Sequence, residues 1–165
     1  MNLMAVWVVL AVASGGVSPP CGAPEYRQLD FWLGDWDSFD SGEKEPSARV
    51  RVDSALDGCA IRERYEGANG SVGESLSTYD AARKLWHQTW ITNRGQFLVI
   101  EGRFLDGRMV LEGTLRDRKG GESTIRGTWK GEGATVHEWA ETSPDSGKTW
   151  TVLFDIVFRH RRVLD

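Results

Sequence analysis

Two tryptophans and a glutamine alternate along residues 85–92 of this chain. Trp86, Gln88 and Trp90 recur at every second position, the spacing that places side chains on one face of a β-strand. Indole rings with an amide between them can bind a small amphipathic molecule, because the rings bury apolar surface while the amide orients polar groups. The same rings can instead fill the interior of a small barrel, which needs large side chains even without a ligand.

Polar side chains occur among large apolar ones in other segments with the same alternation. Cys59, Ile61, Glu63 and Tyr65 share one face of residues 59–66. A buried glutamate facing Arg126 would be either part of a binding site or a structural ion pair. The full set of candidate ligand-binding residues is Glu63, Tyr65, Trp86, Gln88, Trp90, Arg126, Trp129 and Trp139.

The residue types used in catalysis and metal binding show no recognisable spacing. The histidines are His87, His137 and His160, too far apart for a local zinc motif. Four carboxylates fall on different expected strands: Glu63, Glu101, Glu141 and Asp155. There is no Gly-x-Ser-x-Gly turn and no glycine-rich phosphate loop. We therefore predict no catalytic residue and no metal ligand, and an enzyme acting at the mouth of the fold remains an alternative.

The elements that must position these side chains are short strands. Residues alternate with a period of two in ten segments, at 35–40, 47–56, 59–66, 72–79, 85–92, 96–104, 108–117, 122–130, 134–142 and 149–160. Turn signals such as Asp57-Gly58, Asn69-Gly70 and Asp106-Gly107 separate them. Evenly spaced strands without helices between them predict an antiparallel meander, and closing it removes exposed edges. We expect an all-β barrel of about 8–10 strands, preceded by one short helix at 24–33.

The last segment predicts most clearly which face is inside. Every second residue is apolar there: Trp150, Val152, Phe154, Ile156 and Phe158.

The N-terminus resembles an export signal. Residues 3–13 are apolar, too few to span a membrane but typical of a signal-peptide core, and Ala11-Val12-Ala13 offers a cleavage site. We expect residues 1–20 to be a signal peptide and short spacer, cleaved near Ala13, and residues 21–165 to be one domain. The mature protein would be periplasmic or secreted, without stable membrane insertion.

Charge and cysteine content narrow the partners and the compartment. The net charge is −4 and basic residues do not cluster, which argues against nucleic acid as a partner. Cys21 and Cys59 are the only cysteines, and an exported protein would pair them in a disulfide. A catalytic cysteine is the alternative, although neither has a neighbouring histidine. Ligand identity and oligomeric state are not determined by these patterns.

Gly34-x-Trp36 after a short helix resembles the calycin superfamily. In that family the tryptophan closes the barrel base under an arginine from the last strand, which implies a role for Arg159, Arg161 or Arg162. The longer match comprises DFWLGDWD at 30–37, Gly58-Cys59, Tyr79-Asp80, Trp86-x-Gln88-x-Trp90, Gly113, Arg126-x-Thr128-Trp129, and Ser143-x-Asp145-x-Gly147-Lys148-Thr149-Trp150. It resembles a bacterial family of exported lipocalin-like domains of unknown function, which implies the fold and the compartment but no catalytic residues.

Residues 143–150 resemble the Asp-box of sialidases, S-x-D-x-G-x-T-W, which is a folding device in a hairpin loop. We expect structural roles for Asp145, Gly147 and Trp150. Resemblance to the nitrobindin barrels, which hold haem through one histidine near the last strand, makes His160 a candidate axial ligand.

These observations favour an exported barrel that binds or carries a small amphipathic molecule and uses no cofactor. The alternatives are an interaction or assembly module with a packed interior, a haem-binding barrel, or an enzyme at the barrel mouth.

Overall fold

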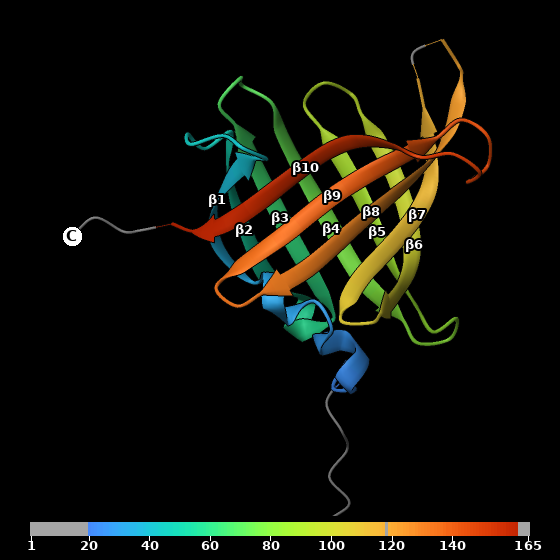
Figure 1. Cartoon of the computed structure of the whole chain (residues 1–165). Helices are drawn as coiled ribbons and strands as arrows, with labels where there is room; N and C mark the ends of the chain where they lie inside the picture. The colour runs from blue at the N-terminus through green and yellow to red at the C-terminus, as the bar shows by residue number, and fades with distance from the viewer. Residues whose placement is uncertain (1–19, 118, 162–165) are drawn as a thin grey trace, which may run out of the picture.

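Ten antiparallel strands form a closed barrel in the computed structural model, which describes residues 20–117 and 119–161. Each strand pairs with the next along the chain, and β1 pairs with β10 to close the sheet (Figure 1). The strands are β1 (Gly34–Asp40), β2 (Ala48–Ala55), β3 (Ala60–Gly67), β4 (Val72–Asp80), β5 (Leu85–Thr92), β6 (Phe97–Leu105), β7 (Arg108–Arg116), β8 (Glu122–Glu132), β9 (Thr135–Ser143) and β10 (Thr151–His160). The predicted all-β antiparallel barrel is confirmed.

Alternation along each strand separates the interior from the outer surface. In β2, Ala48, Val50 and Val52 are buried, while Arg49 and Arg51 between them are exposed. Antiparallel pairing carries this pattern from strand to strand, because directly opposed residues point to the same side of a sheet. Val52 thus lies opposite Glu63, and Glu63 opposite Ser75, all on the inner wall.

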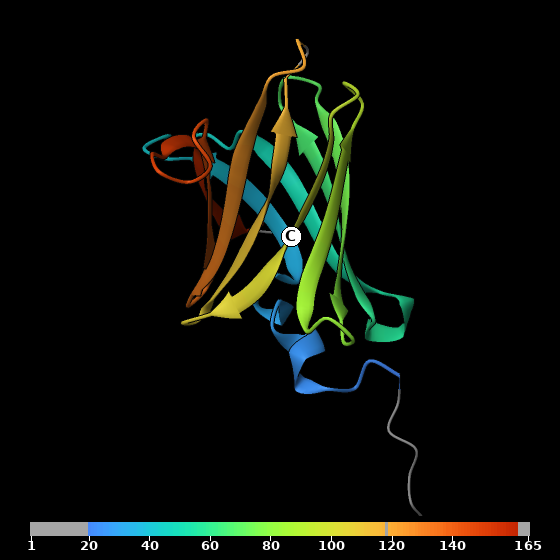
Figure 2. The ribbon, with the colours of Figure 1, turned by 90° about the vertical axis from the view of Figure 1, so that its right-hand side faces the viewer.

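One end of the barrel is closed by the N-terminal segment, which Figures 1 and 2 show below the strands. Two short 3-10 turns, η1 (Pro24–Arg27) and η2 (Asp30–Trp32), stand where one helix was expected. Trp32 is fully buried, with its ring centroid 5.9 Å from that of Trp129 and 6.0 Å from that of Phe158. Gln28 accepts a hydrogen bond of 2.9 Å from the indole N–H of Trp86. These contacts make residues 24–33 the plug of the barrel.

The residue that covers Trp36 differs from the one implied by the family resemblance. The imidazole of His160 stacks on the indole, with centroids 3.9 Å apart and planes inclined by 23°. Arg159 lies over Phe39 instead, and Arg161 reaches the carbonyl of Trp36 rather than its ring. The register explains this, because Trp36 lies directly opposite His160. Arg162 lies outside the described residues.

Gly34 allows the chain to leave the plug and enter β1. Its φ of +151° disfavours other residues, and a Cβ there would lie 3.1 Å from Cε1 of His160 and 3.2 Å from the ring of Trp36. A side chain at this position would therefore disturb the stack.

The apolar face predicted for residues 150–158 is interrupted by a β-bulge. The pairing of β10 with β9 shifts between Val152 and Phe154. Phe154, Ile156 and Phe158 follow the inner wall, but Val152 lies on the outer surface and is 61% exposed. The bulge inserts one residue and so reverses the alternation before it.

The predicted disulfide between Cys21 and Cys59 is confirmed. It joins the residues before η1 to the end of η3 (Leu56–Gly58), the turn between β2 and β3. Arg27 donates a hydrogen bond to the carbonyl of Gly58, and Tyr26 packs edge-on against Tyr79. The plug is thus attached to the barrel by a disulfide and by the side-chain contacts of Arg27 and Tyr26. The expected signal peptide falls on residues outside those described, apart from Pro20 in its spacer.

Among residues 20–117 and 119–161, no helix has the length and apolar character needed to cross a membrane.

Candidate functional site

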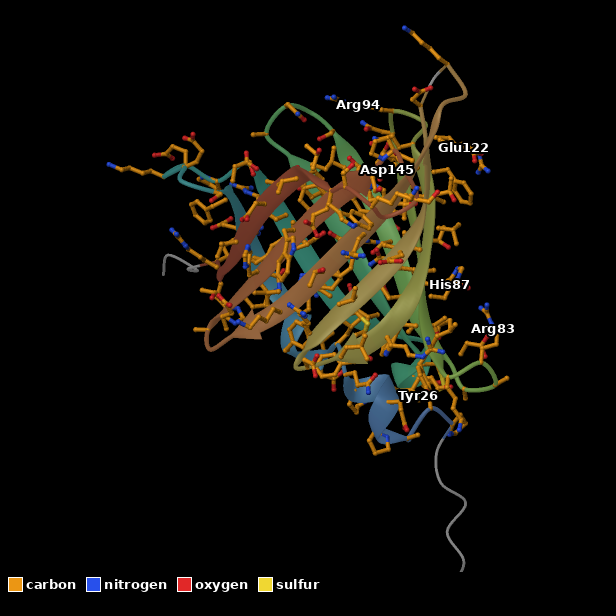
Figure 3. The ribbon with its side chains drawn as sticks, turned by 45° about the vertical axis from the view of Figure 1, so that its right-hand side comes forward. Tyr26, Arg83, His87, Arg94, Glu122 and Asp145 are labelled. Atoms are coloured by element: carbon orange, nitrogen blue, oxygen red, sulfur yellow. A yellow bond between two sulfur atoms is a disulfide. The ribbon has the colours of Figure 1, made fainter. Side chains whose placement is uncertain are left out.

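A cavity of about 1360 Å³ lies inside the barrel above the plug. Its lining reaches the turns after β3, β5 and β7, so it opens at the end opposite η1 and η2. Figure 3 shows Arg94, Glu122 and Asp145 at this open end and Tyr26 at the closed one. The volume exceeds the range of about 300–1,000 Å³ that is common for small-molecule sites. Side chains therefore do not fill the interior.

Most of the cavity wall is apolar. Aliphatic and aromatic side chains from β6, β7, β8 and β10 form it: Leu98, Ile100, Leu115, Ile125, Phe154 and Ile156. Trp129 and Phe158 also line the cavity, and both pack on Trp32 of the plug. An apolar ligand body could bury its surface against this wall.

Five of the eight residues singled out from the sequence line the cavity. They are Glu63, Tyr65, Gln88, Trp90 and Trp129. The indole of Trp90 meets the ring of Tyr65 edge-on at 6.0 Å, and it covers Gly73, where a Cβ would lie 2.3 Å from Cη2. Gln88 donates a hydrogen bond of 3.0 Å to the Ser77 hydroxyl. The absence of a side chain at Gly73 thus makes room for Trp90.

The other three residues lie elsewhere. Trp86 points inward but is buried against the plug, below the cavity. Arg126 is on the outer surface, where it donates a hydrogen bond of 2.6 Å to Glu112 and lies 3.8 Å above the ring of Trp150. Trp139 is also outside, 4.7 Å from the ring of His137. Arg126 and Glu63 therefore do not form the ion pair that the sequence left open.

The cavity is also lined by a second glutamate, which was not among the residues predicted from the sequence. Glu138 in β9 lies opposite Trp129 and Ile156, both of which point inward. Its neighbours at alternate positions, Val136 and Ala140, are buried, but the larger Trp139 on the other face of β9 favours the opposite assignment from the sequence alone. Glu138 and Glu63 are 9% and 7% exposed, and they come from separate walls of the barrel.

Burial shapes the acidity of both carboxyls. Removal from water raises the pKa of Glu63 to about 7, against a lowering by the hydroxyl of Ser75, which donates a hydrogen bond of 2.8 Å. Burial also raises the pKa of Glu138 well above its usual value, and the charge of Glu63 adds to the rise. The Trp129 indole N–H opposes it, although that group lies outside ordinary hydrogen-bond geometry. The two carboxyls thus influence each other's protonation.

Charged side chains surround the mouth. Arg94 donates a hydrogen bond to the carbonyl of Asn69, and Arg116 pairs with Glu122 at 2.7 Å. Phe97 lies between them on the rim and is 68% exposed. A ligand would pass this mixed rim before it reaches the apolar wall.

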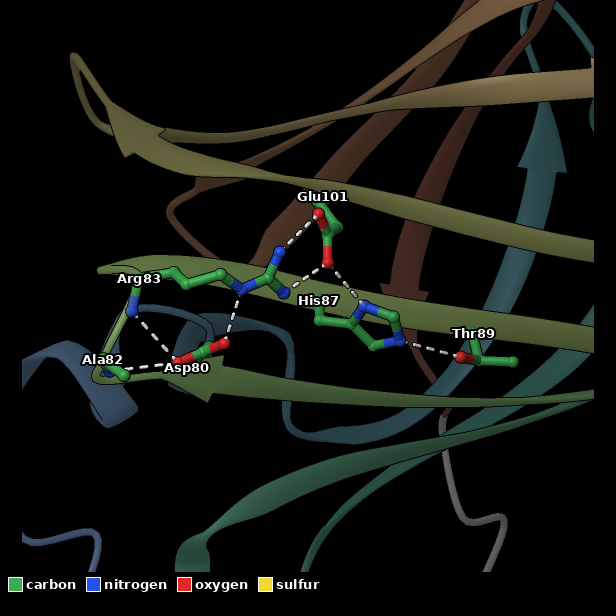
Figure 4. A network of polar contacts seen from close by, with 6 residues as sticks. All are labelled: Asp80, Ala82, Arg83, His87, Thr89 and Glu101. Atoms are coloured by element: carbon green, nitrogen blue, oxygen red, sulfur yellow. Dashed lines mark hydrogen bonds and ion pairs between the residues drawn. The ribbon is translucent and has the colours of Figure 1, made fainter.

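The remaining polar networks face away from the cavity. Figure 4 shows Glu101 between Arg83 and His87, with distances of 2.6 Å and 3.0 Å. Hydrogen bonds from the Arg83 guanidinium and, to a smaller extent, from His87 lower the pKa of Glu101 to about 2. His137 contacts Asp155 at 3.0 Å on another part of the outer wall. His87 and His137 thus each contact a carboxylate on the outer wall, and neither lines the cavity.

The position of His160 does not suit the axial haem ligand that the nitrobindin resemblance implies. His160 is exposed and its ring lies flat on Trp36, apart from the cavity lining, so it is not placed as an axial ligand. Within the part of the chain that the structure describes, no three His, Cys, Asp or Glu side chains gather as metal ligands.

The loop after β9 is organised by Asp145. Its carboxylate accepts hydrogen bonds from the backbone of Lys148 and Thr149 and from the hydroxyl of Ser143. The hydrogen bonds from Thr149 are the largest of the effects that lower the pKa of Asp145 to about 2. The indole N–H of Trp150 donates to the carbonyl of Gly147. Asp145 thus folds this loop at the cavity rim through hydrogen bonds.

Comparison with models of known protein families finds no match to this chain, and comparison with curated proteins finds none. The class of protein is therefore defined by architecture: a closed ten-stranded antiparallel barrel, plugged at one end by a short helical segment, consistent with a calycin-like fold.

Proposed function

We propose that this protein is a lipocalin-like carrier that binds a small amphipathic molecule inside the barrel. The observation that carries the proposal is the cavity of about 1360 Å³, open at one end and lined by an apolar wall with few polar groups. Such a surface favours a ligand with an apolar body and a polar head. Glu63, Tyr65, Gln88, Trp90 and Trp129, together with Glu138, form the proposed binding residues.

The test is a titration with Nile red, a neutral dye whose fluorescence rises in apolar surroundings. We expect the protein to bind the dye and Trp90→Ala to weaken binding by about tenfold or more, since Trp90 lines the cavity. Trp139→Ala is the matched control, because it removes the same side chain from the outer wall. Failure of the dye to bind, or equal losses in both variants, would contradict the proposal.

We further propose that the protein works outside the cytoplasm, in the periplasm or after secretion. The disulfide between Cys21 and Cys59 supports this location, because such bonds persist in oxidising compartments. Fractionation of cells that express the full chain, with mass measurement of the recovered protein, tests both export and cleavage near Ala13.

A further inference from the structure

Below the rim, which carries Asp40, Asp117 and Glu122, the described lining of the cavity contains two acids and no basic side chain. Glu63 and Glu138 point into it from β3 and β9, and the lining residues in the barrel wall around them include no Lys, Arg or His. The two arginines of the lining, Arg94 and Arg116, belong to the rim, and Arg116 is already paired with Glu122. A buried carboxylate is costly unless a positive charge or hydrogen-bond donors compensate it.

The two carboxyl groups differ in the hydrogen bonds that they receive from the protein. Glu63 accepts the hydrogen bond from Ser75, whereas the donor that faces Glu138, the indole N–H of Trp129, lies outside ordinary hydrogen-bond geometry. Two polar atoms of the cavity lining lack partners among the described residues, the hydroxyl of Ser38 in β1 and the indole N–H of Trp129 in β8. Ser38 is 1% exposed, so its hydroxyl has no access to bulk water. Polar groups without partners in the cavity lining indicate where a ligand's polar head would bind.

We propose that the ligand is a cationic amphiphile, whose protonated amine lies between Glu63 and Glu138 and whose apolar body packs on Trp90, Ile100 and Phe154. The inference rests on the proposed function, since it requires that the cavity binds a ligand. An ammonium group has three donors and a full positive charge, which match two carboxylates and a further acceptor of the cavity lining such as the Ser38 hydroxyl. No covalent step is involved.

The same cavity would serve other ligands poorly. A carboxylate or phosphate head would find no cation in the described wall below the rim, and each glutamate would repel it when ionised. A neutral alcohol would give up the charge-assisted part of the interaction, although its apolar body would bind equally well. Affinity should therefore fall from amine to alcohol to carboxylate when the apolar body stays the same.

The experiment displaces Nile red with decylamine, decan-1-ol and decanoate, which share one chain length, at about pH 8, where an alkyl amine is protonated. We expect decylamine to displace the dye at a concentration about tenfold or more below that of the alcohol, with decanoate weakest. The double variant Glu63→Gln with Glu138→Gln should lose this preference, and each single variant should reduce it. Glu112→Gln removes a carboxylate from the outer wall and should leave it unchanged.

The outcomes separate the two proposals. If the dye does not bind, the proposed function fails. If the dye binds but the alcohol or decanoate displaces it as well as the amine, the cavity binds ligands and the cationic assignment is overturned. Persistence of the amine preference in the double glutamine variant would also overturn it. A circular dichroism spectrum like that of the unmodified protein shows that each variant is folded.

Discussion

His160 stacks on Trp36 where β10 meets β1, with the ring centroids 3.9 Å apart. The indole N–H of Trp36 also donates a hydrogen bond of 2.9 Å to the carbonyl of Trp32 in the plug. One tryptophan thus links the seam of the barrel to its closed end. The family resemblance placed an arginine on this ring, and a histidine provides the same flat contact.

Loss of this stack should weaken the fold measurably. We expect His160→Ala to lower the free energy of unfolding by about 1 kcal/mol, the usual size of an aromatic pair beyond its buried area. His160→Arg should retain most of the stability, because a guanidinium can also stack on an indole. Urea unfolding of the three proteins measures this. Equal stability of all three would show that the stack contributes nothing.

Stability should fall as pH rises through the range in which the cavity glutamates ionise. The pKa of Glu63 is 4.5 when the carboxyl is free in water and about 7 in the fold. Between these values the folded state holds a proton that the unfolded state has released, so folding becomes less favourable as pH increases. Glu63 alone should lower the free energy of unfolding by about 3 kcal/mol from pH 4.5 to 7.

The raised pKa of Glu138 should continue this loss at higher pH. Urea unfolding at a series of pH values gives the slope, and Glu63→Gln and Glu138→Gln should each flatten it, since an amide does not ionise. The outer-wall variant Glu112→Gln is the control. A slope that is the same in the glutamine variants and the unmodified protein would contradict the assignment.

The disulfide should stabilise the barrel through the plug. The two cysteines are separated by 38 residues, so the chain-entropy estimate for their bond is about 4 kcal/mol. We expect the double variant Cys21→Ser with Cys59→Ser to unfold at a lower urea concentration. A reducing agent should destabilise the unmodified protein to a similar degree and leave the serine variant unchanged. If the reductant affects both proteins equally, the loss does not come from this bond.

Gly73 should control the position of Trp90. A Cβ added at Gly73 would lie 2.3 Å from the indole, so Gly73→Ala must displace the ring. We expect a shift in tryptophan emission and weaker Nile red binding. Once Trp90 is replaced by alanine, the second substitution should have no further effect on binding. An additional loss in the double variant would indicate that Gly73 acts independently of Trp90.

The sequence predicted the strands well because turn signals and alternation are local properties. It predicted which face is inside less well, and β9 shows the physical reason. Val136, Glu138 and Ala140 line the inside of this strand, while Trp139 lies outside. Hydrophobicity alone would place Trp139 inside and Glu138 outside, because an indole is more apolar than a carboxyl group. A wall that is partly polar weakens the cue that ordinarily sets the face of a strand.

In strand β8, the prediction that Arg126 lines the cavity could have been avoided by following the alternation of side chains. Ile125, Gly127 and Trp129 point inward, so Arg126 between them must point outward. The bulge in β10 is different, because its position depends on how two strands pair across the seam and not on either sequence alone. Proximity of Glu63 and Glu138 likewise depends on closure of the sheet, which brings residues 75 positions apart into one cavity.

The seam between β1 and β10 also determines how this protein can meet other proteins. Residues 36–40 pair with residues 156–160, so every strand in the described chain has hydrogen-bonded neighbours on both sides. A peptide cannot extend such a sheet by adding a strand, and exchange of a strand between two copies would require the seam to open first. Partners would have to bind through the loops at the mouth or through side chains on the outer wall, and fibril growth by edge pairing has no starting point while the barrel is closed.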